Sequence, residues 1–275
     1  IPRLDRQLAP ATVEQHRQLD ARRPAVVEQF VHRGANGAPG RDGSLFRSAR
    51  AGASGQDGGD AFATANGTIV TEGRQSAGVL ASSIGGVGGS GGNGGTFRWG
   101  QAGGAGGDGG RVYVDGNGAI RTQGDWASGV FAVSHGGLGG AGGTGAFVTP
   151  GGNGGIGGQG GAVTVNGNWN IETGTDTTGQ YAFGIWAKSV GGDAGSGGSG
   201  GWLAGAPGSG GQATDGGLVQ VTSGGTILTR GAYAAGIHAQ SVGGFGGSGG
   251  GGFSLFYSRG GSGASAGSGG AVTVT

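Results

Sequence analysis

The sequence predicts an all-β fold, a β-solenoid (β-helix) whose repeats carry stacked polyglycine-II hairpins, with a short helical segment at the N-terminus. Glycine content is the first observation: 80 of the 275 residues are Gly, whereas about 7% is usual. The second observation is that these glycines recur in phase with a repeat of 51 to 55 residues. Each ordered Gly costs about 0.5–1 kcal/mol relative to Ala. We therefore expect the glycines to serve close backbone packing.

Four copies of one anchor segment define the repeats, at residues 77–86, 128–137, 183–192 and 235–244. They share a Gly, a β-branched residue directly after it, a Ser and a closing Gly pair, and the repeat-anchor glycines are Gly78, Gly129, Gly184 and Gly236. Internal repeats of this length indicate a stacked architecture. The predicted repeats cover about 60–110, 111–161, 162–217 and 218–270, and a fifth begins at 271–275.

The first part of each repeat, about 25 residues long, predicts one rung of the solenoid. It alternates β-branched and polar residues and is broken by Asn-Gly and Gly-Gly turns, which is typical of strands joined by tight turns. The third copy has a four-residue insertion before its anchor. Stacking is expected to align two apolar columns, Ile69, Ile120, Ile171 and Ile227 in one and Val79, Val130, Ile185 and Ile237 in the other.

The second part of each repeat is a glycine tract built on the unit Gly-Gly-X, as in GGVGGSGGNGG over residues 85–95. A period of three matches the polyproline-II helix, which has three residues per turn and no internal hydrogen bonds. Such chains must satisfy their backbone groups sideways. We therefore predict that each tract forms a hairpin and that successive hairpins stack into a polyglycine layer beside the solenoid.

Bulky side chains interrupt the middle of every tract and predict the hairpin tips. The candidate tip residues are Phe97, Trp99, Phe147, Trp202, Leu203, Phe253, Phe256 and Tyr257. Two interpretations stay open at this point. The tips form an exposed adhesive or assembly edge, since large apolar patches mark interaction sites, or they pack on one another and close the polyglycine layer.

Residues 1–59 fit neither pattern and are predicted to be a separate N-terminal segment. Residues 12–23 and 24–33 are expected to be helices, because a capping-box pair opens the first and Pro24 opens the second. A short Gly-rich linker follows. The segment could cap the solenoid, dock onto another subunit or lie on a membrane surface. Docking would give a head-to-tail polymer in which residues 1–33 of one chain meet the open strand 271–275 of the next.

The anchor at 235–244 and the glycine tract after it resemble the repeat of glycine-rich passenger regions in Gram-negative bacterial autotransporter (type V secretion) adhesins. The other three anchors match it more loosely, and the resemblance covers residues 60–275 only. It implies Sec-dependent export and a C-terminal outer-membrane β-barrel. It also implies an extracellular or cell-surface location, anchored in the outer membrane or released, and a role in adhesion, aggregation or biofilm. No catalytic residue is attached to this repeat.

Other chemistry finds little support in the sequence. Cys is absent, the four His residues share no metal-ligand spacing, and the net charge of +1 does not favour nucleic acid. The scattered acids Asp108, Asp115, Asp125 and Asp215 are expected to be turn residues. No run is long enough for a membrane span. We therefore expect no enzyme, no metal and no cofactor.

The expected function is that of a structural surface or secreted protein in adhesion, or the subunit of an extracellular fibre. Its expected partners are copies of itself or other cell surfaces. The alternatives are a phage-tail-type adhesin tip, an exported polysaccharide-acting β-helix enzyme, an ice-binding protein built from polyglycine helices, and a disordered elastic matrix protein.

Overall fold

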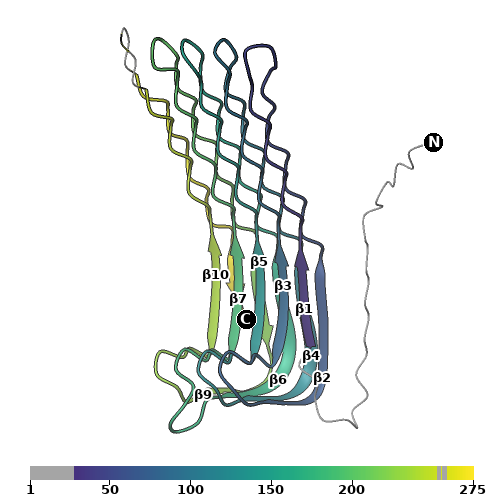
Figure 1. Ribbon diagram of the computed structural model, residues 1–275. Coiled ribbons are helices and arrows are strands. Elements are labelled where there is room, and N and C mark those ends of the chain that lie inside the picture. The colour runs from purple at the N-terminus through teal and green to yellow at the C-terminus, as the bar shows by residue number, and fades with distance from the viewer. Residues whose placement is uncertain (1–27, 253–254, 256–258) are drawn as a thin grey trace, which may run out of the picture.

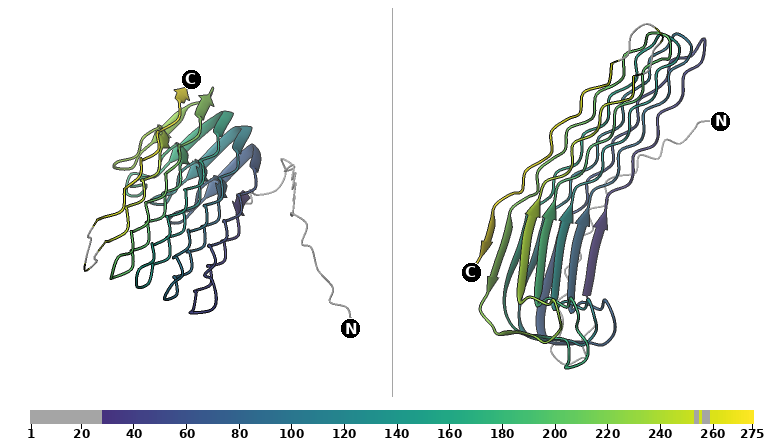
Figure 2. Two further views of the ribbon diagram at one scale, coloured as in Figure 1. Left: turned by 90° about the horizontal axis from the view of Figure 1, so that it is seen from above. Right: turned by 90° about the vertical axis from the view of Figure 1, so that its left-hand side faces the viewer.

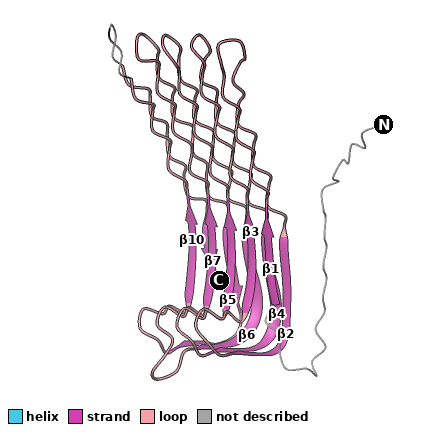
Figure 3. Ribbon diagram, in the orientation of Figure 1, coloured by secondary structure: helices cyan, strands magenta, loops and turns pink. Residues whose placement is uncertain are grey.

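The computed structural model describes residues 28–252, 255 and 259–275, and over these residues the fold is all-β with no helix (Figure 3). One parallel sheet contains, in spatial order, β1 (Glu28–Arg33), β3 (Val79–Ile84), β5 (Val130–His135), β7 (Ile185–Val190) and β10 (Ile237–Val242). The other contains β11 (Val272–Val274), β8 (Val219–Ser223), β6 (Val163–Thr173), β4 (Val112–Thr122) and β2 (Ala61–Thr71), and β9 (Ile227–Thr229) also pairs with β6.

The chain alternates between these two sheets, and each strand pairs in parallel with the equivalent strand one repeat away (Figure 1). This arrangement is compatible with a β-helical or solenoid-like fold. No helix of the described residues is long and apolar enough to cross a membrane.

Both predicted apolar columns are present. The isoleucine column runs through direct register partners, Ile69 with Ile120, Ile120 with Ile171 and Ile171 with Ile227. The second column joins Val79, Val130, Ile185 and Ile237 in the same way. Their side chains meet between the sheets, where mostly Ala, Val and Ile are buried. Low apolar content is therefore enough for a thin, continuous core.

Among the described residues, Trp169 is the one large aromatic side chain that is fully buried in this core. Its indole Nε1 donates a hydrogen bond to the carbonyl oxygen of Ala65, two strands away, at 2.9 Å. Gly118 is the register partner of Trp169 on the neighbouring strand. A Cβ on Gly167 would lie 2.1 Å from the Trp169 ring, so the absent side chain there leaves space for the indole.

The glycine tracts form hairpins that extend from the ends of the strands and lie side by side (Figure 2). Their backbone hydrogen bonds repeat every three residues, as the Gly-Gly-X spacing predicts. In the first hairpin the N–H groups of Gly34, Gly37 and Gly40 donate to carbonyl groups of the second, at 2.6–2.8 Å. The other Gly of each unit donates to a returning arm, as Gly140 does to Gly104 at 2.8 Å.

Two expectations for the N-terminal segment are wrong. Residues 28–33 are strand β1, not part of a helix, and they pair with β3 in the register of the later repeats. Residues 34–58 form a further glycine hairpin of the array, so no boundary falls at residue 59. The helix expected at 12–23 lies outside the described residues. The described ends of the expected docking pair, β1 and β11, pair within their own chain, with β3 and β8.

The reason for this error is physical. The first hairpin has Gly only at every third position, because among the described residues it has a neighbouring hairpin on one side only. Ala35, Ala38 and Arg41 stand where later hairpins have the second Gly. These three side chains are exposed, while the Gly residues that face the second hairpin are kept. The apolar spacing near Phe30 therefore marks a strand, with Phe30 packed against the core and Val31 exposed.

Candidate functional site

In the second, third and fourth hairpins the predicted tip residues lie at or directly beside the turns, as expected from the sequence. Short turns close the second, third and fourth hairpins, with Arg98 N–H donating to Gly95 at 2.9 Å, Thr149 to Ala146 at 2.9 Å and Gly205 to Gly201 at 3.0 Å. The glycine arms thus carry these residues away from the two sheets to one end of the molecule (Figure 1).

The aromatic tip rings contact one another along the row. The Phe97 and Phe147 ring centroids are 6.0 Å apart at an interplanar angle of 87°, and Phe147 and Trp202 are 5.3 Å apart at 71°. Edge-to-face pairs of this kind contribute about 0.5–1.5 kcal/mol each. The rings nevertheless stay open to solvent, because Phe97 is 61% exposed, Trp99 65% and Trp202 58%. The tip rings therefore both contact one another and form an exposed apolar edge, so each of the two earlier interpretations holds in part.

The remaining predicted tip residues have different outcomes. Leu203 is half-buried beside Trp202, and its N–H donates to the carbonyl oxygen of Phe147 at 2.9 Å. Phe253, Phe256 and Tyr257 lie outside the described residues. Leu255, from the glycine tract after the fourth hairpin, is exposed, and its N–H donates to the carbonyl oxygen of Trp202 at 3.2 Å.

Sequence reasoning missed one tip, that of the first hairpin. Leu45 and Phe46 occupy its turn, and Phe46 is 90% exposed, the most exposed large apolar side chain described. This tip is also basic. The charge of Arg47 is the main influence that lowers the pKa of Arg41, and Arg50 adds to it. The sequence did carry a signal for this tip, because the apolar pair Leu45-Phe46 comes just after the Gly-X-X run of residues 34–43.

The repeat-anchor glycines pack against the isoleucine column. A Cβ on Gly78 would lie 2.4 Å from Cγ2 of Ile120, and the same contact joins Gly129 to Ile171 and Gly184 to Ile227. Gly236 has only a 3.6 Å contact, to Ile227. The anchors thus have a packing role.

The anchor serines tie the glycine layer to the sheet. Ser134 Oγ donates to the carbonyl oxygen of Gly110 and accepts from the N–H of Gly161, both at 2.9 Å. Ser189 does the same between Gly161 and Gly217 at 2.8 Å. Each serine therefore links the ends of two successive hairpins, a role the anchor pattern alone did not show.

The scattered acids lie in a turn, in strand β4 and in two returning arms. Of the four singled out, only Asp125 lies in a turn, so the expectation is wrong for Asp108, Asp115 and Asp215. Asp108 and Asp215 lie in returning arms, where each Oδ1 accepts a backbone N–H from the next hairpin at 2.7 Å. Stacking creates this contact, because it places a backbone N–H beside each carboxylate. Within the described part of the chain, no three His, Cys, Asp or Glu residues could hold a metal ion.

A second aromatic row lies at the opposite end, in the loops that join the two sheets. Trp126 stacks on Tyr181 with ring centroids 4.4 Å apart, and Tyr181 stacks on Tyr233 at 5.2 Å. All three have φ between 55° and 59°, a left-handed conformation that is uncommon for bulky residues. Its recurrence at one position of successive repeats shows that it belongs to the turn geometry.

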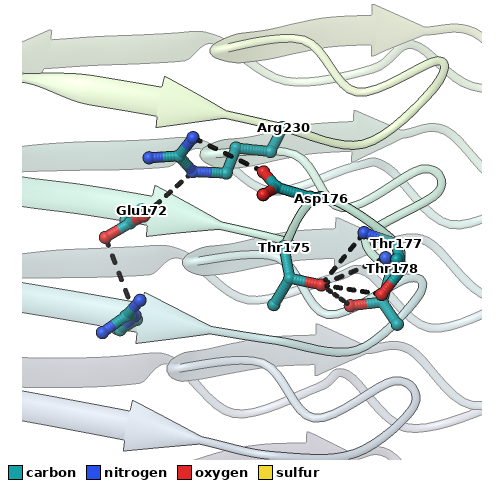
Figure 4. A network of polar contacts seen from close by, with 7 residues as sticks. Glu172, Thr175, Asp176, Thr177, Thr178 and Arg230 are labelled. Atoms are coloured by element: carbon teal, nitrogen blue, oxygen red, sulfur yellow. Dashed lines mark hydrogen bonds and ion pairs between the residues drawn. The ribbon is translucent and has the colours of Figure 1, made fainter.

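The four-residue insertion lies in the same group of loops (Figure 4). Thr175 Oγ1 is 2.8 Å from Thr178 Oγ1 within it. Beside it, Glu172 lies between Arg230, at 3.0 Å, and Arg121, at 3.7 Å. These ion pairs are on the surface, where such pairs contribute about 0–1 kcal/mol. We therefore assign these surface ion pairs no role in a binding site.

Comparisons with known proteins identify no family. No protein-family model matches this sequence, and no curated protein matches it. Among solved structures, the chain aligns with an antifreeze protein from the springtail Granisotoma rainieri, described as a nine polyproline type II helical bundle, at 24% identity. The alignment covers 89% of this chain and 96% of that one, with a TM-score of 0.14. At that score the likeness carries no argument about fold or function.

Proposed function

We propose that the chain is a β-solenoid with stacked polyglycine-II hairpins and that it acts as a structural, adhesive array. The exposed aromatic row at the hairpin tips carries this proposal. Phe46, Phe97, Trp99 and Trp202 each expose more than half of their surface. An apolar surface that remains in water is costly, and such patches mark interaction sites.

The glycine layer supports an adhesive role because it makes the row rigid. Each hairpin is hydrogen bonded to its neighbours at every third residue, so the tips are held in register instead of swinging on flexible loops. Aromatic side chains that are ordered before contact lose little conformational freedom on binding. Repetition of the tips also allows several weak contacts at once, which raises overall avidity.

The proposed setting is the bacterial cell surface or the extracellular space, as in the glycine-rich passenger regions that the repeat resembles. The proposed partners are copies of the same protein or other cell surfaces, in adhesion, aggregation, biofilm or a fibre. A chain without Cys needs no oxidising step to fold outside the cell. The resemblance and the tip row support this setting independently.

Adhesion measurements on two matched variants test the proposal. The tip variant Phe97→Ser/Trp99→Ser/Trp202→Ser removes exposed rings from the row. The control Leu228→Ser/Tyr233→Ser removes exposed apolar side chains far from the tips. We would measure retention of protein-coated beads on polystyrene and self-association by sedimentation velocity, with circular dichroism as a check of folding.

We expect the tip variant to retain at least about tenfold fewer beads than the wild type, because each buried ring contributes about 1.5–3 kcal/mol. The control should behave as the wild type does. Equal adhesion of the wild type and the folded tip variant, or an equal loss in the control, would show that the tips are not the adhesive surface.

A further inference from the structure

The outward face of the sheet formed by β2, β4, β6 and β8 carries a groove with a volume of about 870 Å³. It crosses four strands and is far from the hairpin tips. Two rows of polar side chains line it. One row contains Thr64, Asp115, Asn166 and Thr222, and the next contains Asn66, Asn117 and Asn168.

The groove is open because glycines, not side chains, lie among the polar rows. Gly116, Gly118 and Gly167 line it with backbone only. Gly116 and Gly118 have φ of 144° and 128°, a region that disfavours residues with a side chain. A Cβ on Gly116 would also lie 1.9 Å from the carbonyl oxygen of Ala65. The hollow is therefore built into the backbone.

Several polar groups of the groove have no hydrogen-bond partner among the described residues. Oδ1 of Asp115 is buried and unpaired. The side chains of Asn117, Asn166 and Asn168 also make no hydrogen bond within this part of the chain, in contrast to Asn66, whose Oδ1 accepts from the N–H of Asn117 at 3.1 Å. A buried acceptor without a donor is costly. The groove thus presents both acceptors and amide donors to a ligand.

We propose that this groove binds a neutral glycan strand lying across the β-strands. Sugar hydroxyl groups donate and accept hydrogen bonds, so they match both Asp115 Oδ1 and the asparagine amides. The polar groups recur at the spacing of neighbouring strands, about 4.8 Å, which suits a repetitive polymer. Phe62 and Tyr113 are register partners on the same face, two residues before the first row, and offer an apolar border for a sugar ring.

Charge and composition favour binding of a neutral glycan over other ligands. Asp115 is the one charged residue that lines the groove, so an acidic polysaccharide would meet a like charge. One carboxylate is too few for the paired acids that glycoside hydrolysis requires, so the glycan would be held and not cleaved. A single carboxylate also makes a poor site for a divalent cation, which prefers several oxygen ligands.

Titration calorimetry with defined oligosaccharides tests this proposal on the full chain. The probes are cellohexaose and chitohexaose, which are neutral, an acidic oligogalacturonide of the same length, and CaCl₂ alone. The groove variants are Asp115→Thr, which places the residue found at the equivalent positions 64 and 222, and Asn117→Ala. The control Gln220→Ala changes an exposed residue of the same face outside the groove.

We expect at least one neutral hexasaccharide to bind the wild type. Each groove variant should weaken that binding about fivefold to tenfold through the loss of one hydrogen bond, and Gln220→Ala should leave it unchanged. The tip variant described above should also bind normally, which separates this proposal from the adhesive one. No neutral binding at millimolar concentration, tighter binding of the acidic probe, a response to CaCl₂ alone, or equal affinity in folded groove variants would overturn the proposal.

Discussion

A single methyl group placed inside the glycine layer should destabilise the protein, and the same methyl group at the layer's surface should not. Gly140 is buried between hairpins, and a Cβ there would lie 2.0 Å from the carbonyl oxygen of Gly89 and 2.6 Å from its carbon. Gly263 is exposed in the last returning arm, where a Cβ has one contact, at 3.7 Å. Gly140→Ala and Gly263→Ala are therefore a matched pair.

The magnitude follows from the hydrogen bonds that must move. Separating the arms by about 1.4 Å, to reach an ordinary contact distance of 3.4 Å from 2.0 Å, breaks two of them: Gly104 N–H to Gly89 at 2.7 Å and Gly140 N–H to Gly104 at 2.8 Å. Each lost bond that leaves a buried group unpaired costs about 1–3 kcal/mol. Replacing Gly by Ala also restricts the unfolded chain, which offsets about 0.4–1 kcal/mol. The net loss for Gly140→Ala is about 1–5.5 kcal/mol, since two bonds cost about 2–6 kcal/mol and the unfolded-chain effect offsets about 0.4–1 kcal/mol of it.

Gly263→Ala creates no close contact and only restricts the unfolded chain, so it should stabilise the protein by about 0.4–1 kcal/mol. The two substitutions are thus expected to shift the unfolding midpoint in opposite directions. Thermal unfolding followed by circular dichroism, on both variants and the wild type, measures these shifts. A Gly140→Ala midpoint at or above that of the wild type would refute the close packing of the glycine arms.

Two further predictions concern the sheets and the loops between them. Gly129→Ala should lower the unfolding midpoint, because its Cβ would lie 2.5 Å from Cγ2 of Ile171. The control Gly236→Ala should be tolerated, because its Cβ has one contact, at 3.6 Å. Equal midpoints for the two variants would contradict this packing role. The pKa of Asp125 lies below its ordinary value, mainly because its carboxylate accepts the N–H groups of residues 179 and 180. Its contribution to stability is therefore present above about pH 4 and is lost as the pH falls through the lowered pKa. Asp125→Asn should accordingly be less stable than the wild type at pH 7, and the difference should shrink at pH 2; a difference that is independent of pH would count against the pairing.

The regular parts of the fold were predictable because the sequence is periodic. Stacking aligns equivalent residues, so the positions of Ile69 and Ile120 predict their contact directly, and the Gly-Gly-X unit predicts a hydrogen-bond period of three. The same logic places bulky residues such as Phe147 at the hairpin turns. What repeats along the chain is also what touches in space.

The parts that sequence reasoning missed depend on contacts within or at the edge of a repeat. The first hairpin has a neighbour on one side only among the described residues, so Ala38 stands where later repeats need Gly, and the pattern is diluted. Ser134 bonds to groups 24 and 27 residues away in sequence, a distance that no local motif encodes. The groove was visible in principle, since Asn66, Asn117 and Asn168 recur every 51 residues, but polar recurrence alone does not distinguish a binding row from a solvated one.

The adhesive tips depend on the glycine layer, whereas the proposed glycan groove lies on the β-sheet. One substitution in the glycine layer can therefore test the two proposals separately. Gly140 lies in the layer between the sheets and the tip at Phe147, so a spread of the arms at that point would disturb the ring contact with Phe97. The groove lies on β4 and β6, which pair along their whole length and whose inward side chains pack in the core between the sheets. Folded Gly140→Ala protein should therefore lose adhesion while it still binds the glycan. If the folded variant loses both, a local spread of the arms also disturbs β4 and β6, and the hairpins are part of what positions the strands.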